Sequence, residues 1–255
     1  MIWSKIFKPI FKPSQTVVGL DLTGRVGLGI RLTINNQKVT VEDYWSFSLA
    51  EGDQGNLLKK VKSAKVLVVG RVDDLKQKIN NLESASPAKA LVNVFVPDNQ
   101  YYLLIDLKEN NLLVAENHQV VDSLKLEFSL LDLSRKIGES LGLDFVTVME
   151  KITTSDLSVL DKNYQAMVLP WCLYLDREVE KLLNRPSRFD KQILLIDQTR
   201  GLKLFLQSKH DFKIIEGDIL ANLAYNLTSI PNIPKPELLE YRLALGAGLE
   251  ALVAK

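Results

Sequence analysis

The sequence predicts an α/β protein built from two lobes, and three observations support this class. Short apolar segments typical of buried strands alternate with amphipathic helical segments along the chain. A strand, an aspartate, a short turn and a second strand follow one another at residues 16–32. The same order recurs at residues 193–206. A repeated opening unit indicates an internal duplication, and the polar stretch at 153–158 is the expected boundary between the lobes.

Composition limits the classes of function. The 255 residues carry 32 Lys and Arg against 31 Asp and Glu, so no basic field favours nucleic acid as a partner. Cys172 is the only cysteine, which excludes an internal disulfide and a cysteine-rich zinc site. His118 and His210 are the only histidines and lie far apart in sequence. No apolar run reaches the roughly 20 residues of a membrane-spanning helix. We therefore expect a cytoplasmic protein.

The first half is predicted to open with a three-stranded meander. Its strands are the segments rich in β-forming residues at 16–23, 25–34 and 37–48. Further buried strands are predicted at 66–69, 90–97, 101–107 and 143–149. Helical spacing of apolar residues predicts helices at 57–65, 72–82 and 129–141. Gly142 is placed to end the last of these helices.

The second half is predicted to begin with a long helix at 165–183, in which Pro170 is a kink or an early helix position. After the strand pair at 193–206, the expected elements are a strand at 212–215, a helix at 217–227 and a final helix at 238–254. A proline-rich linker separates the last two helices, and Gly246 and Gly248 are expected to interrupt the final one.

Several catalytic motifs fail on inspection. The glycines between Gly24 and Gly29 are in the wrong order for a dinucleotide site, and a strand rather than a helix follows them. No Walker-type sequence and no nucleophile elbow occurs. Cys172 lies in an apolar stretch, where a buried, unreactive thiol is expected. We expect no catalytic residue and therefore no enzyme.

The first 15 residues form a leader in which aromatic and basic side chains alternate. Trp3, Phe7 and Phe11 are interspersed with lysines, and the leader has no acidic residue. One interpretation is contact with an anionic membrane surface or a partner protein. The other is a terminus that tucks a few aromatic side chains onto the domain. The sequence leaves both open.

The order of these segments resembles the actin-like ATPase superfamily, and within it the PilM family of type IV pilus assembly. The type II secretion protein GspL and the MshI-type pilus proteins are close alternatives. Residues 18–24, Val-Gly-Leu-Asp-Leu-Thr-Gly, resemble the phosphate-1 segment, and residues 195–199, Leu-Ile-Asp-Gln-Thr, occupy the phosphate-2 position. Other matching segments are the strand pair of a small inserted subdomain at 92–97 and 101–107, its closing strand at 143–148, the second glycine segment at 214–219 and the last helix at 241–249.

This resemblance implies an actin-like (ribonuclease H-like) fold of duplicated lobes, with a small inserted α+β subdomain and one reduced lobe. The leader would end at residue 15, and the first lobe would span 16–152 with the insertion at about 66–148. The second, reduced lobe would span 153–255.

The resemblance also implies that the nucleotide site is vestigial. Its phosphate turns would comprise Asp21, Thr23, Gly24, Asp197, Thr199, Gly201 and Gly217. Bulky Arg25 and Val26 follow the first turn, whereas nucleotide-binding members have small residues there. The proline-rich linker stands where those members have a further lobe and an adenosine-binding loop. We therefore expect no cofactor and no metal, with ATP and Mg²⁺ as the alternative ligands.

The two strand-end acids allow two interpretations. Asp21 and Asp197 could form a paired-carboxylate magnesium site, or they could be inherited acids that cap their turns. The missing loop favours the second interpretation. A further hypothesis is that Arg25 and Arg200 replace the metal by pairing with these acids.

The resembled family implies a cytoplasmic scaffold, peripheral to the inner membrane, in a type IV pilus or type II secretion-like assembly platform. It would bind the cytoplasmic N-terminal segment of a membrane-anchored assembly protein of the PilN type and link it to the assembly ATPase, with no nucleic acid involved. The inserted subdomain is the expected binding region, with Tyr101 and Tyr102 as contacts or, alternatively, as ordinary strand aromatics. The alternative function is an active actin-like ATPase or a sugar-kinase-like phosphotransferase.

Overall fold

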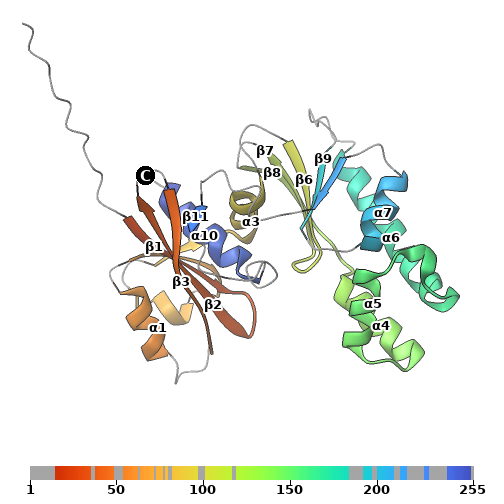
Figure 1. The fold of residues 1–255 in the computed structure, drawn as a ribbon, viewed down its shortest axis with the longest axis horizontal. Helices are drawn as coiled ribbons and strands as arrows, with labels where there is room; N and C mark the ends of the chain where they lie inside the picture. Colours follow the sequence, from red (N-terminus) through yellow and green to blue (C-terminus); the bar gives the residue numbers. More distant parts are fainter. Residues whose placement is uncertain are drawn as a thin grey trace, which may run out of the picture. The chain divides into compact units, whose positions relative to one another are not determined.

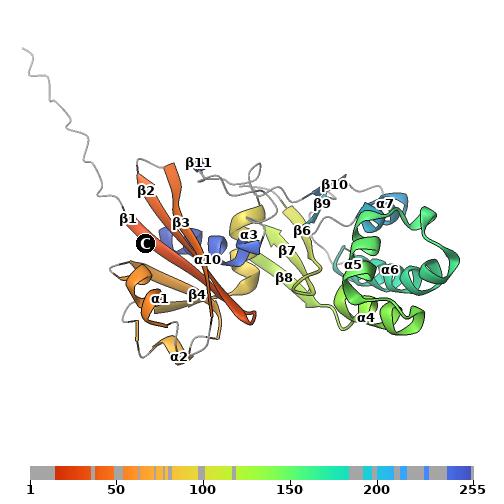
Figure 2. The same cartoon turned by 60° about the horizontal axis from the view of Figure 1, so that its bottom comes forward.

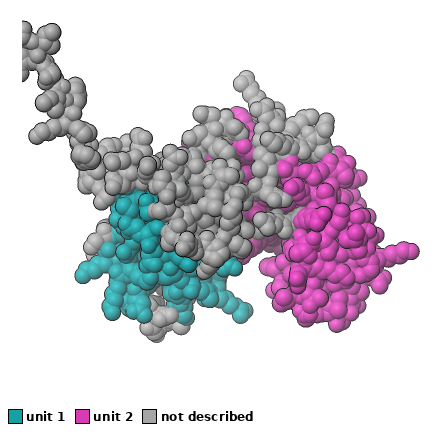
Figure 3. All heavy atoms as spheres, in the orientation of Figure 1, with its two compact units in different colours: residues 1–94, 223–255 teal, residues 95–222 magenta. Residues whose placement is uncertain are grey.

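The computed structural model divides the chain into two compact units (Figure 3). It describes residues 15–35, 38–48, 54–62, 64–71, 73–76, 78–79, 82–96, 101–116, 119–183, 192–196, 200–209, 213–216, 227–229 and 240–253. Unit 1 comprises residues 1–94 and 223–255, and unit 2 comprises residues 95–222. The expected boundary at 152–153 falls within a helix of unit 2. Unit 2 begins at residue 95, inside the insertion expected at about 66–148, and the end of the chain belongs to unit 1.

Unit 1 is built on a six-stranded sheet in the order β11-β3-β2-β1-β4-β5. Its strands are β1 (Gln15–Leu22), β2 (Val26–Asn35), β3 (Lys38–Ser48), β4 (Lys65–Gly70), β5 (Leu82–Ala85) and β11 (Leu227–Ser229). The first three strands are antiparallel, and β1, β4 and β5 are parallel. The predicted meander and the strand at 66–69 are therefore confirmed.

Helices cover both faces of this sheet (Figures 1 and 2). They are α1 (Gln54–Val61), α2 (Asp73–Lys76), α3 (Pro87–Phe95) and α10 (Arg242–Val253). Val18 and Leu20 of β1 pack into one core cluster with Leu57 and Val61 of α1. Gly19, on the opposite face by strand alternation, lies against α10.

Helix α10 packs closely because glycines remove side chains from its contacts. A Cβ atom added at Gly19 would lie 1.8 Å from the carbonyl oxygen of Ala244, and one at Gly246 would lie 2.0 Å from that of Ala90 in α3. The prediction that Gly246 and Gly248 interrupt the final helix is therefore wrong, because α10 runs without a break through both residues. They allow its backbone to approach the sheet and α3.

Unit 2 is built on a five-stranded sheet in the order β10-β9-β6-β7-β8. Its strands are β6 (Tyr101–Asp106), β7 (Asn111–Glu116), β8 (Gln119–Lys125), β9 (Gln192–Leu195) and β10 (Lys213–Glu216). Strands β6, β7 and β8 form an antiparallel meander, and β6, β9 and β10 are parallel. This is the same order of meander and parallel strands as in unit 1, so the predicted duplication is present.

The helices of unit 2 pack with its sheet into one core cluster. They are α4 (Leu130–Leu141), α5 (Phe145–Thr154), the 3₁₀ helix η2 (Leu157–Val159), α6 (Lys162–Leu183) and α7 (Arg200–Lys209). Ser129 caps α4 in a reciprocal capping box with Asp132, and Gly142 ends it in the left-handed region with φ 64°. The predicted start and end of this helix are confirmed. Pro170 lies inside α6, well beyond its first turn.

Three predicted strands are helices instead. Residues 90–97 largely form α3, which begins at Pro87, a favourable first helical residue. Residues 143–149 mostly belong to α5, because Asp144 accepts a hydrogen bond from the Thr147 amide as its N-cap. The segment after Asp197 is α7. The helix predicted at 72–82 is limited to α2, and the expected helix at 217–227 and linker at 229–236 lie almost entirely outside the described residues.

Candidate functional site

The turn after β1 is the first candidate site. The Asp21 carboxylate accepts hydrogen bonds from the Thr23 amide at 2.9 Å and from the Thr23 hydroxyl at 2.7 Å. Asp21 itself is buried, whereas Thr23, Gly24 and Arg25 are exposed. The acid therefore ends the strand by satisfying its own turn, as the capping interpretation expects.

Gly70, at the end of β4, supports this turn from behind. Its φ of 104° favours glycine, and a Cβ there would lie 2.7–2.8 Å from backbone atoms of Leu22 and Thr23. The sequence-based interpretation did not identify this residue. Its position at the end of a buried valine-rich strand is the signal that could have indicated it.

The equivalent turn of unit 2 follows β6 and carries Asp106. This fully buried carboxylate accepts hydrogen bonds from the amides of Lys108 and Glu109, both at 3.2 Å. Asn110 closes the turn in the left-handed region, with φ 58°. The residues that a phosphate would approach here are a lysine and a glutamate instead of small residues.

The second strand–acid–turn–strand unit is therefore not where the sequence predicts it. Both Asp21 and Asp106 end the first strand of a meander, whereas β9 is one of the parallel strands of unit 2. Gly201 lies in α7, where a Cβ would meet the Ser155 carbonyl oxygen at 2.7 Å, so it serves helix packing. Asp197, Thr199 and Gly217 lie outside the described residues.

Two other glycines of the opening segment have a packing role. Gly27 and Gly29 pair across the sheet with Phe47 and Trp45, and added Cβ atoms would lie 2.4 Å from those aromatic rings. The glycines thus make room for two aromatic side chains on β3. This agrees with the rejection of a dinucleotide motif at residues 24–29.

The predicted pairing of Arg25 with Asp21 and a possible metal site can be compared with the structure. Among the residues that the structure describes, no ion pair joins Arg25 to Asp21, and no group of three or more His, Cys, Asp or Glu side chains could hold a metal ion. Burial and the nearby Asp176 raise the pKa of the Cys172 thiol to about 12. This thiol stays protonated near neutral pH, as the sequence predicts.

The predicted partner contacts fall into two groups. Tyr102 is 4% exposed on a strand flanked by β7 and β9, so its side chain belongs to the core, and burial raises its pKa. Tyr101 is half-buried and is the more accessible of the pair. Trp3, Phe7 and Phe11 lie outside the described residues. None of the helices described here is long and apolar enough to cross a membrane.

Comparison with known proteins identifies the fold. No protein-family profile matches the sequence, and no curated protein sequence is significantly similar to it. Among solved structures, a chain of a PilM-PilN type IV pilus biogenesis complex is 12% identical, with a TM-score of 0.62, 92% of this chain and 98% of that chain covered.

Two further structures widen the comparison. A candidate N-acetylmannosamine kinase from Listeria monocytogenes is 12% identical, with a TM-score of 0.59 and 93% and 99% of the two chains covered. The activator of 2-hydroxyisocaproyl-CoA dehydratase from Clostridium difficile, with bound ADPNP, is 15% identical, with a TM-score of 0.52 and 93% and 94% covered. Together with the two equivalent sheets, these similarities show that the chain has the actin-like α/β fold.

Proposed function

We propose that this protein is a scaffold of a type IV pilus or type II secretion-like assembly platform at the inner membrane. It binds the cytoplasmic N-terminal segment of a membrane-anchored partner of the PilN type and links that partner to the assembly motor. The observation that carries the proposal is the similarity of its fold, across 92% of the chain, to a protein of a PilM-PilN complex.

The proposed scaffold works without ATP hydrolysis, and the two strand-end turns support this. Nucleotide-binding turns offer free backbone amides to phosphate. Here the amides of Thr23, Lys108 and Glu109 already donate to the aspartate of their own turn.

Isothermal titration calorimetry with Mg-ATP and with Mg-ADPNP tests this part of the proposal. We expect no saturable heat from either nucleotide, because three of the turn amides already donate to the aspartates of their own turns. A dissociation constant in the micromolar range would contradict the proposal and favour the alternative, an active ATPase or phosphotransferase, for which the nucleotide-bound activator of the same fold is the precedent.

The scaffold role needs a direct binding measurement. Synthetic peptides that match the cytoplasmic N-terminal segments of PilN-type proteins from the same genome would be titrated against the full chain. We expect one of them to bind, and we expect Tyr101→Ala to weaken it, because Tyr101 is the accessible member of the predicted tyrosine pair.

Val121→Ala is the matched control for this measurement. Val121 is 51% exposed on β8 of the same sheet, so its truncation removes surface apolar area without touching Tyr101. If no PilN-type peptide binds, the scaffold role is wrong. If a peptide binds with equal affinity to all three proteins, only the tyrosine contact is wrong.

A further inference from the structure

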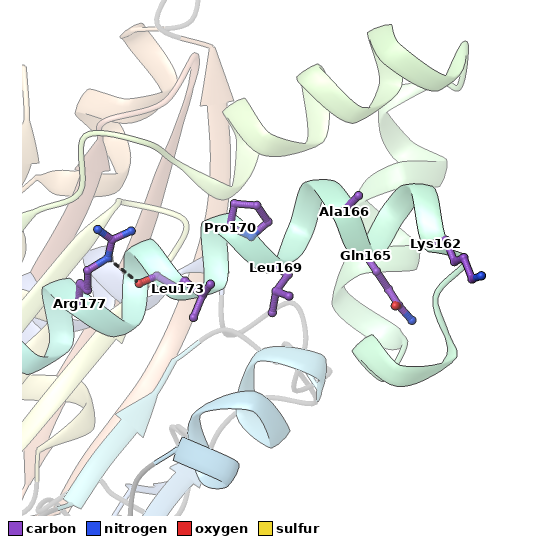
Figure 4. Close-up of a pocket in the computed structure, with 7 residues that line it drawn as sticks. All are labelled: Lys162, Gln165, Ala166, Leu169, Pro170, Leu173 and Arg177. Carbon is purple, nitrogen blue, oxygen red and sulfur yellow. Dashed lines mark hydrogen bonds between the residues drawn. The ribbon is translucent and has the colours of Figure 1, made fainter.

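Helix α6 of unit 2 leaves a row of apolar side chains at the surface. Leu169 is 46% exposed and Leu173 is 37% exposed, and both side chains project from the same side of the helix (Figure 4). A hollow of about 490 Å³ follows this row, which we call the α6 groove. Its lining residues are Lys162, Gln165, Ala166, Leu169, Pro170, Leu173 and Arg177.

Two smaller hollows adjoin the α6 groove and extend the apolar surface. One, of about 330 Å³, shares Ala166 and Pro170 and continues to Phe128 and Tyr174. The other, of about 230 Å³, shares Gln165 and Leu169 and continues to Leu157 and Phe205 on η2 and α7. Continuous apolar surface of this kind, spread over several elements, is typical of an interaction site.

The charged residues that are known to line these hollows are basic. Lys162 and Arg177 lie at the two ends of the α6 groove, and Lys136 lines the adjoining hollow next to the Phe128 ring, 4.2 Å from its centroid. Among the residues that the structure describes, no aspartate or glutamate lines any of the three hollows. Within the described part of the chain, neither Lys162 nor Arg177 forms an ion pair. The surface therefore matches an apolar ligand that carries negative charge.

Pro170 interrupts the backbone hydrogen bonds of α6 at the groove. Proline has no amide hydrogen, so the carbonyl of Ala166, four residues earlier, lacks its usual helical donor. Ala166 lines the groove and the adjoining hollow.

We propose that the α6 groove docks a peptide segment of a partner protein in which apolar side chains are flanked by carboxylates. The apolar side chains cover Leu169 and Leu173, and the carboxylates pair with Lys162 and Arg177. The helical rise between these two basic residues is about 22 Å, which fits a helix of about four turns or about seven extended residues. The inference stands independently of the proposed pilus function.

A selection from a random peptide library displayed on phage tests this inference with the full chain as bait. Counter-selection against the Leu169→Glu variant removes peptides that bind elsewhere. We expect the enriched peptides to carry net negative charge around two or three large apolar residues. Failure to enrich any peptide that depends on Leu169, or enrichment of basic peptides, would overturn the proposal.

Fluorescence anisotropy with the best enriched peptide then tests the charge pairing. We expect Lys162→Glu/Arg177→Glu to weaken binding about tenfold or more, and added salt to weaken the wild-type complex. The matched control is Arg71→Glu/Lys125→Glu, which reverses one exposed arginine and one exposed lysine outside the three hollows and should change affinity less than about twofold. Equal loss in both double variants contradicts the pairing.

Sedimentation velocity tests whether a second copy of the chain, rather than a partner peptide, occupies the groove. If the wild-type chain self-associates and Leu169→Glu abolishes this association, the groove is an interface between two copies and the proposal is wrong. Circular dichroism and urea unfolding of each variant show whether a loss of binding reflects the groove or a loss of folding.

Discussion

The two units share one strand order but cover their sheets in different ways. In unit 1, α10 is buried along nearly its whole length because glycines let it approach β1 and α3. In unit 2, α6 has one side in the core, including Trp171 and Leu175, and exposes Leu169 and Leu173 on the other. The same strand order thus occurs with a covering helix that is buried in unit 1 and with one that exposes apolar side chains in unit 2. Strand order alone therefore does not specify how deeply a covering helix is buried.

The aspartates at the strand ends of the two units accept hydrogen bonds from different donors. Asp21 is held by the amide and hydroxyl of one threonine, whereas Asp106 is held by two successive amides in a longer turn. In both cases the acid stabilises its own turn.

The largest expected effect comes from filling the contact that seals unit 1. Gly19→Ala places a Cβ 1.8 Å from the carbonyl oxygen of Ala244, so the helix must move. We expect a loss of about 3 kcal/mol or more in the free energy of unfolding, measured by urea denaturation.

Gly55→Ala is the matched control for this substitution. Gly55 lies in α1, and an added Cβ meets nothing within 4 Å. Because alanine has the higher helix propensity, we expect a gain of about 0.5–1 kcal/mol. A similar change in the free energy of unfolding of both variants would show that the close approach of α10 to Gly19 does not stabilise unit 1.

A smaller effect is expected from the capping box of unit 2. Ser129→Ala removes the hydroxyl oxygen that accepts a hydrogen bond from the Asp132 amide at 2.9 Å. The Asp132 amide at the start of α4 then has no side-chain acceptor. We expect a loss of about 1 kcal/mol in urea denaturation. Ser140→Ala, at an exposed site in the same helix, should change stability by less than about 0.5 kcal/mol. Equal losses would contradict a capping role.

The smallest expected effect is a dependence of stability on pH that arises from helix-capping carboxylates in unit 2. Hydrogen bonds from Ser129 lower the pKa of Asp132, those from Thr147 lower the pKa of Asp144, and the Tyr164 amide lowers that of Asp161. A carboxyl whose folded pKa is lowered contributes stability above its unfolded pKa, near about 4, and loses it as pH falls through the folded pKa. We therefore expect the urea concentration at the unfolding midpoint of the wild-type chain to decrease as the pH is lowered below about 4.

Asp144→Asn separates this titration from capping itself. Asparagine caps a helix about as well as aspartate but carries no titrating proton. The variant should keep most of its stability at neutral pH and lose less of it on acidification. If wild type and Asp144→Asn respond equally to acid, this carboxyl does not contribute.

Local sequence signals were sufficient where one short pattern decides the structure. The opening meander, β4, and the helix from Ser129 to Gly142 are examples, since alternation, capping and a terminal glycine act within a few residues. The same signals failed for α3 and α7. Valine-rich or alternating segments suit strands locally, but in the folded chain they pack as helices.

The sequence by itself indicated the fold class and an internal duplication, and it favoured a capping role for Asp21 over a metal site. Composition, periodicity and turn chemistry are local properties, and they carry this information. Only the tertiary structure decided that the second meander opens at Tyr101, that Gly19 and Gly246 serve helix contacts, and that α6 keeps an apolar, basic-flanked groove. Each of these depends on segments far apart in the chain, so no local pattern could reveal it.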